Sequence, residues 1–438
     1  MRAYLYLPLM LALLSAGAPT FAADEVPTLD AGANGFVLLS AMLVIVMSIP
    51  AIGLFYGGLV RAKNVMSVLE QCLIVFALCI ILWFVCGYSL SFSSDDGVLS
   101  SFIGNFDLAF LLGAGPDALN GSLSLYTWFI FQGAFCAIAA CLIVGASVER
   151  VRFGPLLAII CLWALFSYVP LCHMVWGGGF IDSVFHAYDF AGGTVVHIDA
   201  AVAALVLAKC VGKRTDLGKV LITPHSLPIT YIGMGFLWIG WFGFNAGSQL
   251  ASDGISAMAF VDTAIAPAAA AVSWMAAEWL IYKKPTTLGS ASGVLAGLVA
   301  ITPACGFVSP LGALIIGLIA GPACLYGVHG LKRLIGLDDS LDVFGVHGVG
   351  AIVGALLTGV FCAPSLGGVG FKADITSIGG QVYAQAASVV IAIVWAGVVT
   401  FLACMIVKAL CGGSLRVALD AEREGLDLST HGERGYSL

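Results

Sequence analysis

The chain has 438 residues, of which 60% are hydrophobic and 10% are charged, and its formal net charge is −7. A soluble domain carries about 25% charged residues, so this composition excludes a water-soluble core and indicates an integral membrane protein with many spans. No basic block suggests nucleic acid. The 13 cysteines show neither metal-ligand spacing nor a disulfide framework, and we expect no metal and no cofactor.

The first segment, residues 1–23, has the pattern of a cleavable signal peptide. Arg2 supplies the positive end, residues 5–14 are apolar, and residues 20–22 offer a cleavage site between small residues. An uncleaved anchor helix is the alternative. Cleavage would leave the mature N-terminus outside the cytoplasm.

Apolar stretches of about 20 residues mark helices that can cross a bilayer. We predict an all-α protein with eleven such helices, at 35–60, 65–92, 124–147, 153–172, 192–211, 227–247, 256–281, 287–302, 309–331, 343–362 and 378–411. The eighth is short and could be partly re-entrant. The last is long enough to need a strong tilt or to extend past the bilayer.

The basic residues test this topology, because they concentrate in cytoplasmic loops. With the mature N-terminus outside, 16 of the 18 Lys and Arg residues fall in inner connections or the C-terminal tail. Lys372 alone is outside, and Arg2 is in the leader. We therefore expect a membrane domain at 24–413 and a polar cytoplasmic tail at 414–438, which is the one segment that clearly belongs to water.

Ionisable residues inside spans are functional candidates, and two of the seven histidines qualify. His197 and His347 lie in apolar helices, share the pattern Val-His-x-x-x-Ala, and fall on the fifth and tenth spans. Spans five positions apart run in opposite directions, so the match suggests an inverted repeat that brings both residues near the midplane. The remaining five are most simply solvated or interfacial: His173, His186, His225, His329 and His431.

Regular helices would leave His197 and His347 about 15 Å apart in depth. For them to meet, both helix starts must be recessed behind irregular buried backbone. An Asp precedes each His by eight residues, Asp189 and Asp339, and Asp342 is a further candidate. We expect such an Asp to cap a recessed helix start, with contact to a permeant ion as the alternative.

Two buried histidines have a definite chemistry. Loss of water favours the neutral rings, which can share one hydrogen bond and still offer a donor or acceptor to a solute that does both, such as ammonia. The pair could also relay a proton. It could instead only tie helices together, and a metal would need further ligands.

Aromatic residues cluster near the outer ends of several spans. They occur in Phe131–Phe135, in Trp241–Ser248 and in the stretch from His173 to Trp176. An aromatic face attracts a cation by about 0.5–2 kcal/mol, and a Ser hydroxyl can accept a hydrogen bond. Interfacial anchoring is the alternative.

At these motifs the sequence resembles the ammonium transporter family (Amt, Mep and Rh proteins), and most of all its bacterial Amt branch. The matching stretches span nearly the whole mature chain: Pro50–Leu59, Phe131–Phe135, Glu149–Phe153, His173–Gly179, Asp189–His197, Trp241–Ser248, Thr302–Gly306 and Asp342–His347.

The resemblance implies two inverted five-helix halves plus a long final helix, assembled as a homotrimer with one pore per subunit. By position, His197 and His347 match the twin pore histidines, and Phe135, Trp176 and Ser248 match an outer ammonium recruitment site. Phe135 and Phe244 match a stacked phenyl gate below it, and Asp189 matches the acidic residue that supports the site. The full set is His197, His347, Phe135, Trp176, Ser248, Phe244 and Asp189.

The implied function is ammonium/ammonia transport across the bacterial inner membrane, in contact with membrane lipids, without enzymatic activity. The tail at 422–433 also resembles bacterial members that a cytoplasmic PII-type signalling protein blocks. A sensor that conducts little, a channel for another small neutral molecule and a membrane enzyme are the rival interpretations. The enzyme would need a nucleophile or metal set that the sequence does not place beside the histidines.

Overall fold

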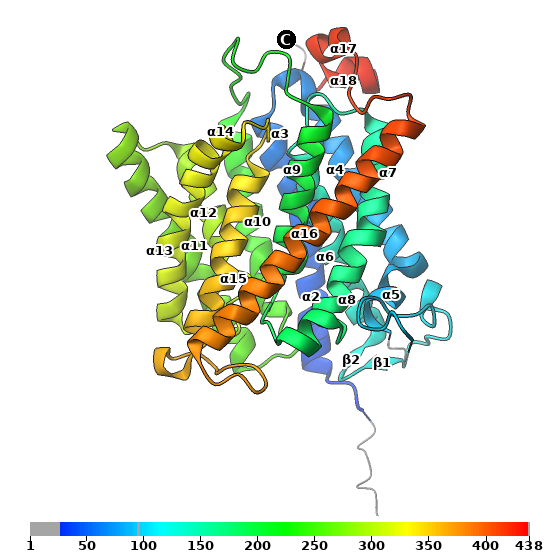
Figure 1. Ribbon diagram of the computed structural model, residues 1–438, viewed down its shortest axis with the longest axis vertical. Coiled ribbons are helices and arrows are strands. Elements are labelled where there is room, and N and C mark those ends of the chain that lie inside the picture. Colours follow the sequence, from blue (N-terminus) through cyan, green and yellow to red (C-terminus); the bar gives the residue numbers. More distant parts are fainter. Residues whose placement is uncertain (1–26, 94–96, 437–438) are drawn as a thin grey trace, which may run out of the picture.

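Backbone groups in hydrocarbon must find their hydrogen bonds within the chain, which is why helices dominate this protein. The computed structural model describes residues 27–93 and 97–436. The predicted signal peptide lies outside the described residues. Figure 1 shows helices running between two ends of the molecule, with the residues that follow the leader at one end and the C-terminal helices at the other.

Five helical segments form the first half, and three of them are interrupted and continue as a second helix. They are α2 (Ala31–Val46) with α3 (Ile52–Leu59), α4 (Val65–Leu82) with α5 (Tyr88–Phe92), α6 (Leu125–Val144), α7 (Phe153–Trp163) with α8 (Val169–Trp176), and α9 (Asp199–Val211). A two-stranded ribbon, β1 (Leu119–Asn120) and β2 (Leu123–Ser124), precedes α6.

Five more segments form the second half, and one long helix follows them. They are α10 (Leu227–Gly247), α11 (Gly254–Tyr282), α12 (Thr287–Ile301), α13 (Pro310–Tyr326) with the short α14 (Lys332–Ile335), α15 (Val349–Phe361), and then α16 (Ile378–Leu410). The tail carries α17 (Leu419–Glu424) and α18 (Leu426–His431).

The described residues contain ten helical segments long and apolar enough to cross a membrane, and α12 is a further, shorter apolar helix of 15 residues. This agrees with the eleven predicted spans. Most predicted boundaries lie within four residues of the observed ones. The fourth is the exception, because that segment continues through α8 and a further turn to Phe185.

Helix α16 is the long final helix that the sequence predicts. Its 33 residues cross the molecule obliquely in Figure 1. The helix packs against α15 of the second half and against α7 and α9 of the first half. Small side chains allow the close approach, as at Gly397, whose hydrogen faces Val202. The final helix therefore joins the two halves.

A buried ionic network lies at the end of the molecule that carries the tail. Glu149 pairs with Arg61 at 3.0 Å and with Arg214 at 3.5 Å, and Arg214 also pairs with Asp338 at 2.8 Å. Arg150 is fully buried and donates to the Asp338 main-chain oxygen. These connections between helices are thus fixed by charge-assisted hydrogen bonds.

The tail is anchored to the membrane domain through two buried carboxylates, although most of its described residues are exposed. Glu422 is 2% exposed and accepts a hydrogen bond from the Thr215 amide at 2.8 Å. Asp427 is 3% exposed and accepts from the Ser67 amide at 2.8 Å. The sequence does not reveal this docking, because the donors to the tail carboxylates are backbone amides of other segments.

We predict that Asp338→Asn strongly destabilises the protein. Removing one partner of a buried ion pair costs about 3–5 kcal/mol, and the side chain of Asp338 is fully buried. The measurement is the thermal unfolding midpoint in detergent. The matched control is Asp216→Asn, because Asp216 pairs with Arg61 but keeps 33% of its side chain exposed. That change should cost less than about 1 kcal/mol.

The same pair predicts a pH dependence. Burial raises the pKa of Asp338, but the bonds and charges of Arg214 and Arg150 outweigh it and hold the pKa below its usual value. The folded protein then favours the carboxylate, so the stabilisation is complete above about pH 4 and is lost as the pH falls through the lowered pKa. Wild type and Asp338→Asn should converge in midpoint as the solution is acidified.

Candidate functional site

The two intramembrane histidines meet at the centre of the fold. Nδ1 of His197 lies 3.3 Å from Nδ1 of His347, and the ring planes are inclined by 28°. Both side chains are buried, with residue exposures of 2% and 6%. One ring must donate and the other accept, so the pair shares a single proton along this line. The structure confirms that two residues 150 positions apart in the chain are brought together.

Recessed helix starts make this meeting possible. His197 lies in a π-helical turn, Gly193–Ile198, that leads into α9, and His347 lies in a second one, Phe344–Gly348, that leads into α15. The segments before both turns are largely buried and irregular. This is the arrangement that the depth of the two histidines had predicted.

The predicted Asp caps are both present. Asp189 accepts hydrogen bonds from four consecutive backbone amides at 2.6–3.1 Å, those of Gly192, Gly193, Thr194 and Val195. Asp339 accepts from the amides of Val343 and Phe344 at 3.1 and 2.8 Å. Burial raises the pKa of Asp189, and burial together with Asp342 raises the pKa of Asp339 to about 6.

Asp342 has a different role from the caps. Its carboxylate pairs with Lys332 at 2.6 Å, and its backbone adopts a left-handed conformation with φ of 60°. This residue turns the chain into the recessed helix start rather than capping it.

A column of aromatic rings leads to the histidines. The rings of Phe135 and Phe244 are stacked with centroids 4.0 Å apart and planes inclined by 10°. The Phe244 ring centroid lies 6.0 Å from that of His197. Both phenylalanines are completely buried. A solute that approached the histidines along this line would first have to displace the stacked rings.

Trp176 and Ser248 lie beside this stack. The indole of Trp176 meets the Phe135 ring edge-on, with centroids 6.2 Å apart, and its Nε1 donates to the main-chain oxygen of Asp189 at 2.8 Å. Ser248 follows Phe244 by one turn of α10, and its hydroxyl donates to the Phe244 oxygen at 2.9 Å. That hydroxyl oxygen keeps lone pairs with which to accept a further bond.

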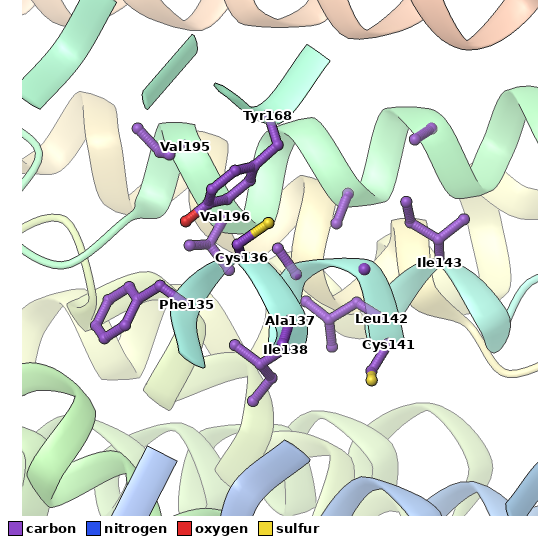
Figure 2. Close-up of a cluster of buried hydrophobic side chains, with 14 of the residues drawn as sticks. Phe135, Cys136, Ala137, Ile138, Cys141, Leu142, Ile143, Tyr168, Val195 and Val196 are labelled. Atoms are coloured by element: carbon purple, nitrogen blue, oxygen red, sulfur yellow. The ribbon is translucent and has the colours of Figure 1, made fainter. Parts of the chain in front are cut away.

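The wall behind the stack is closely packed. Phe135 belongs to a buried run along α6 that begins at Phe131. Val195 and Val196 of the turn that carries His197 lie beside Cys136 and Tyr168 (Figure 2). These side chains are mostly apolar and fill the space, so this side of the stack leaves no room for a water-filled route.

Two adjoining cavities continue from the histidines. The first is lined by side chains from both halves: Met47, Ile52, Phe55, Tyr56, Ile138, Leu142, His197, Leu237, Trp241, Phe244, Leu295 and His347. The second shares Phe55, Tyr56, Leu295 and His347 with the first and reaches Asp342. Together they define a narrow, apolar passage from the phenyl stack toward the end that carries the tail.

Sequence reasoning gave no specific role to two residues of this region. Trp241 stacks on His197 with centroids 5.3 Å apart, and its Nε1 donates to the Thr302 hydroxyl at 2.8 Å. Its position one turn before Phe244 was the available signal. His173, predicted to be solvated or interfacial, is only 2% exposed. That prediction was wrong because α8 continues past His173 and the backbone at Ser91 and Ser100 covers its ring.

The fold and the site define a multi-pass membrane protein with an apolar passage centred on a histidine pair. The chain matches the Ammonium Transporter Family model over residues 35–436. The ammonium transporter of Bacillus subtilis (strain 168) is 42% identical over 411 residues, covering 92% of this chain and 98% of that protein. The ammonium transporter of Aquifex aeolicus (strain VF5) is 40% identical over 440 residues, covering 100% of both.

Solved structures agree with these relatives. A sensor Amt protein superposes with a TM-score of 0.84 at 29% identity, covering 91% of this chain and 98% of that one. Mep2 of Saccharomyces cerevisiae superposes with a TM-score of 0.81 at 32% identity, covering 90% of each chain. This protein belongs to the ammonium transporter family, as its motifs had indicated.

We predict that Asp189→Ala displaces the turn that carries His197. The substitution leaves up to four buried amides without acceptors, at about 1–3 kcal/mol each, so the turn that carries His197 should lose its position. Cysteine accessibility at an introduced Thr194→Cys would report the change. The matched control is Asp253→Ala. Asp253 also caps a helix, accepting from two amides at the start of α11, but it lies at the surface. Unchanged accessibility in Asp189→Ala would contradict the capping role.

Proposed function

We propose that this protein transports ammonium/ammonia across the membrane as a channel-like transporter. The observation that carries the proposal is the histidine pair, 3.3 Å apart, within an apolar passage behind stacked phenyl rings. Such a passage is hostile to an ion that cannot lose its charge and suited to a small neutral solute that can both donate and accept hydrogen bonds.

Recruitment is the first step of the proposed mechanism. Phe135 and Trp176 present aromatic faces and edges near the outer end of the passage, and Ser248 offers a hydroxyl oxygen. Cation–π attraction and the hydroxyl hold ammonium there. Asp189 supports the site indirectly, because its main-chain oxygen fixes the Trp176 indole.

Neutralisation and passage follow. A bare cation in the apolar passage would meet a large desolvation cost. Ammonium avoids this cost by releasing a proton, whereas potassium has none to release, so the difference provides selectivity. Ammonia then passes the Phe135–Phe244 gate and exchanges hydrogen bonds with His197 and His347. The paired rings also offer a path for the released proton.

Topology and assembly complete the proposal. Residues 1–23 are a cleaved signal peptide, the domain at 24–413 lies in the bacterial inner membrane with its N-terminus outside, and the tail at 414–438 is cytoplasmic. The concentration of Lys and Arg at inner connections supports this orientation. We propose a homotrimer among membrane lipids, and a PII-type protein as a partner for the inner face.

A sensor that binds ammonium without conducting it is the second candidate function. A protein described as a sensor Amt protein shares this fold. Two adjoining cavities lined by the histidines favour conduction for this chain. A channel for another small neutral molecule would use the same passage, and competition with ammonium separates it.

The purified protein in liposomes tests the proposal. We expect an inward current after an ammonium jump and none after a potassium jump, with internal pH recorded in the same vesicles. A pH change without current would indicate neutral ammonia conduction. The absence of both a current and a pH change would refute the transport proposal and leave the sensor as the candidate function.

The histidine variants test the passage itself. His197→Ala or His347→Ala removes a ring that completes the proton path, so the current should fall at least tenfold while vesicles retain the protein. The expected magnitude corresponds to losing a single hydrogen-bonding group, at about 1.4 kcal/mol or more. The control is His329→Ala, near the inner end of α13, which should conduct like wild type. Equal currents in all three variants would contradict the role of the pair.

A further inference from the structure

Three polar side chains lie on one face of α16, near the start of this mostly apolar helix. They are Gln381, Gln385 and Ser388, whose spacings of four and three residues place them on the same side of a helix. Their exposures are 0%, 1% and 2%. Buried polar groups on a membrane helix take their hydrogen-bond partners from other segments of the protein, so this face must be bonded to neighbouring elements.

Gln385 pairs with Tyr188 as a neighbouring β-strand would. Its Oε1 accepts from the Tyr188 amide at 2.6 Å, and its Nε2 donates to the Tyr188 main-chain oxygen at 2.8 Å. A side-chain amide carries a donor and an acceptor side by side, so it satisfies both backbone groups of one residue. Tyr188 directly precedes Asp189, whose carboxylate caps the recessed start of α9 and whose main-chain oxygen accepts from Trp176. The contact with α16 therefore lies one residue from the cap.

The two flanking side chains extend this contact along the same segment. Nε2 of Gln381 donates to the main-chain oxygen of His186 at 3.1 Å. The Ser388 hydroxyl donates to the Thr194 hydroxyl at 3.4 Å. Thr194 belongs to the turn that carries His197. The polar face of α16 thus follows the irregular segment up to the first pore histidine.

Gln385 also reaches the helix of the second pore histidine. Its Nε2 donates to the main-chain oxygen of Ala355 on α15 at 3.1 Å, about two turns after His347. The side chain can span this gap because the two helices touch through their backbones. A β-carbon at Gly359 would lie 2.9 Å from the backbone of Val382. One amide therefore bonds both elements that carry the pore histidines.

Other bonds hold the segment before α9, but they attach it to loops. After Asp189, the amides of residues 190–191 donate to the main-chain oxygens of residues 302–303 at 3.2 Å. Before it, Lys372 donates to the main-chain oxygen of Ala187 at 3.1 Å. The turn that carries the first histidine packs on α15 mainly through apolar and small residues. The side-chain amide from α16 adds a directional link between the segment and α15.

We propose that Gln385 is a positioning residue that sets the placement of the two pore histidines relative to each other. Its effect on transport rests on the proposed function, whereas its effect on the backbone does not. Without the amide, Tyr188 loses the partner of both its backbone groups and α15 loses its bond to the same side chain. The capped start of α9 can then shift against α15.

Hydrogen exchange, measured by mass spectrometry on the full-length protein in detergent, tests the backbone role. In Gln385→Leu, peptides covering 186–197 should exchange about tenfold faster than in the wild type, the factor expected for one lost hydrogen bond. The matched control is Gln71→Leu. Gln71 is 1% exposed and donates to Ser67 of its own helix, so its loss should leave 186–197 unchanged. Wild-type exchange in a folded Gln385→Leu protein would overturn the proposal.

Two milder variants keep the test decisive if Gln385→Leu fails to fold. In Gln385→Glu, the carboxyl group carries at most one donor, so it leaves the oxygen of Tyr188 or of Ala355 without its bond. This variant should show most of the increase in exchange. Gln381→Leu removes the bond to His186 and leaves α15 linked, so its effect should be smaller. The reverse order of the two effects would contradict the role of Gln385 as the link to α15.

Transport in liposomes tests the consequence for the pore. The maximal rate of ammonium transport per folded molecule should fall about tenfold in Gln385→Leu, because the histidine pair loses its alignment. A residue with a merely structural role would lower the unfolding midpoint and the yield of folded protein but leave the rate per folded molecule unchanged. Gln71→Leu should transport like the wild type.

The two assays separate the possible failures. A wild type that conducts nothing refutes the proposed function, while hydrogen exchange still decides whether Gln385 fixes the segment before α9. A Gln385→Leu protein that exchanges faster in 186–197 but transports at the wild-type rate per folded molecule would refute its role in placing the histidines.

Discussion

A helix that begins inside a membrane protein exposes backbone amides where no water can reach them, and the rest of this structure depends on how they are satisfied. Asp189 and Asp339 provide the acceptors. Their carboxylates allow α9 and α15 to start deep in the protein instead of at its surface. The histidines, five residues after the first capped amides at one start and four after at the other, can therefore meet. The passage thus depends first on the Asp caps, which bring the two histidines together, and only then on the chemistry of their rings.

The two halves use this device unequally. Asp189 receives four amides and Asp339 receives two. The main-chain oxygen of Asp189 also receives the Trp176 indole, so one residue fixes both a pore histidine and an outer aromatic side chain. On the opposite side, the Asp339 neighbour Asp338 belongs to the ionic network with Arg150 and Arg214. The start of α9 is thus organised around aromatic rings, and the start of α15 around charges.

Much of this arrangement could be predicted from the sequence, because the membrane imposes simple rules. Apolar length located the helices, Lys and Arg separated the two faces in the topology model, and the shared Val-His pattern identified His197 and His347. The depth mismatch between these histidines required recessed helix starts, and Asp189 and Asp339 could then be predicted as the caps of those starts. The family motifs, more than any physical rule, singled out Phe135, Trp176, Phe244 and Ser248.

The remaining features depend on contacts that a single sequence does not encode locally. Burial of His173 arises from a segment more than seventy residues earlier in the chain, and its bonds are to main-chain oxygens. The docked tail likewise uses Glu422 and Asp427 to accept backbone amides. Trp241 required knowledge of which face of α10 meets His197. In each case the partner is backbone or comes from a distant segment, and composition gives no signal for it.

The oblique course of α16 has a mechanical meaning. Because this helix packs on α15 of one half and on α7 and α9 of the other, a rocking motion of the halves would shear both contacts at once. Packed interiors resist such continuous sliding. Helix α16 therefore argues against a mechanism in which the two five-helix halves alternate between two rigid-body orientations. In the proposed transport mechanism, rotation of the stacked Phe135 and Phe244 rings would then open the passage, on the time scale of side chains rather than domains.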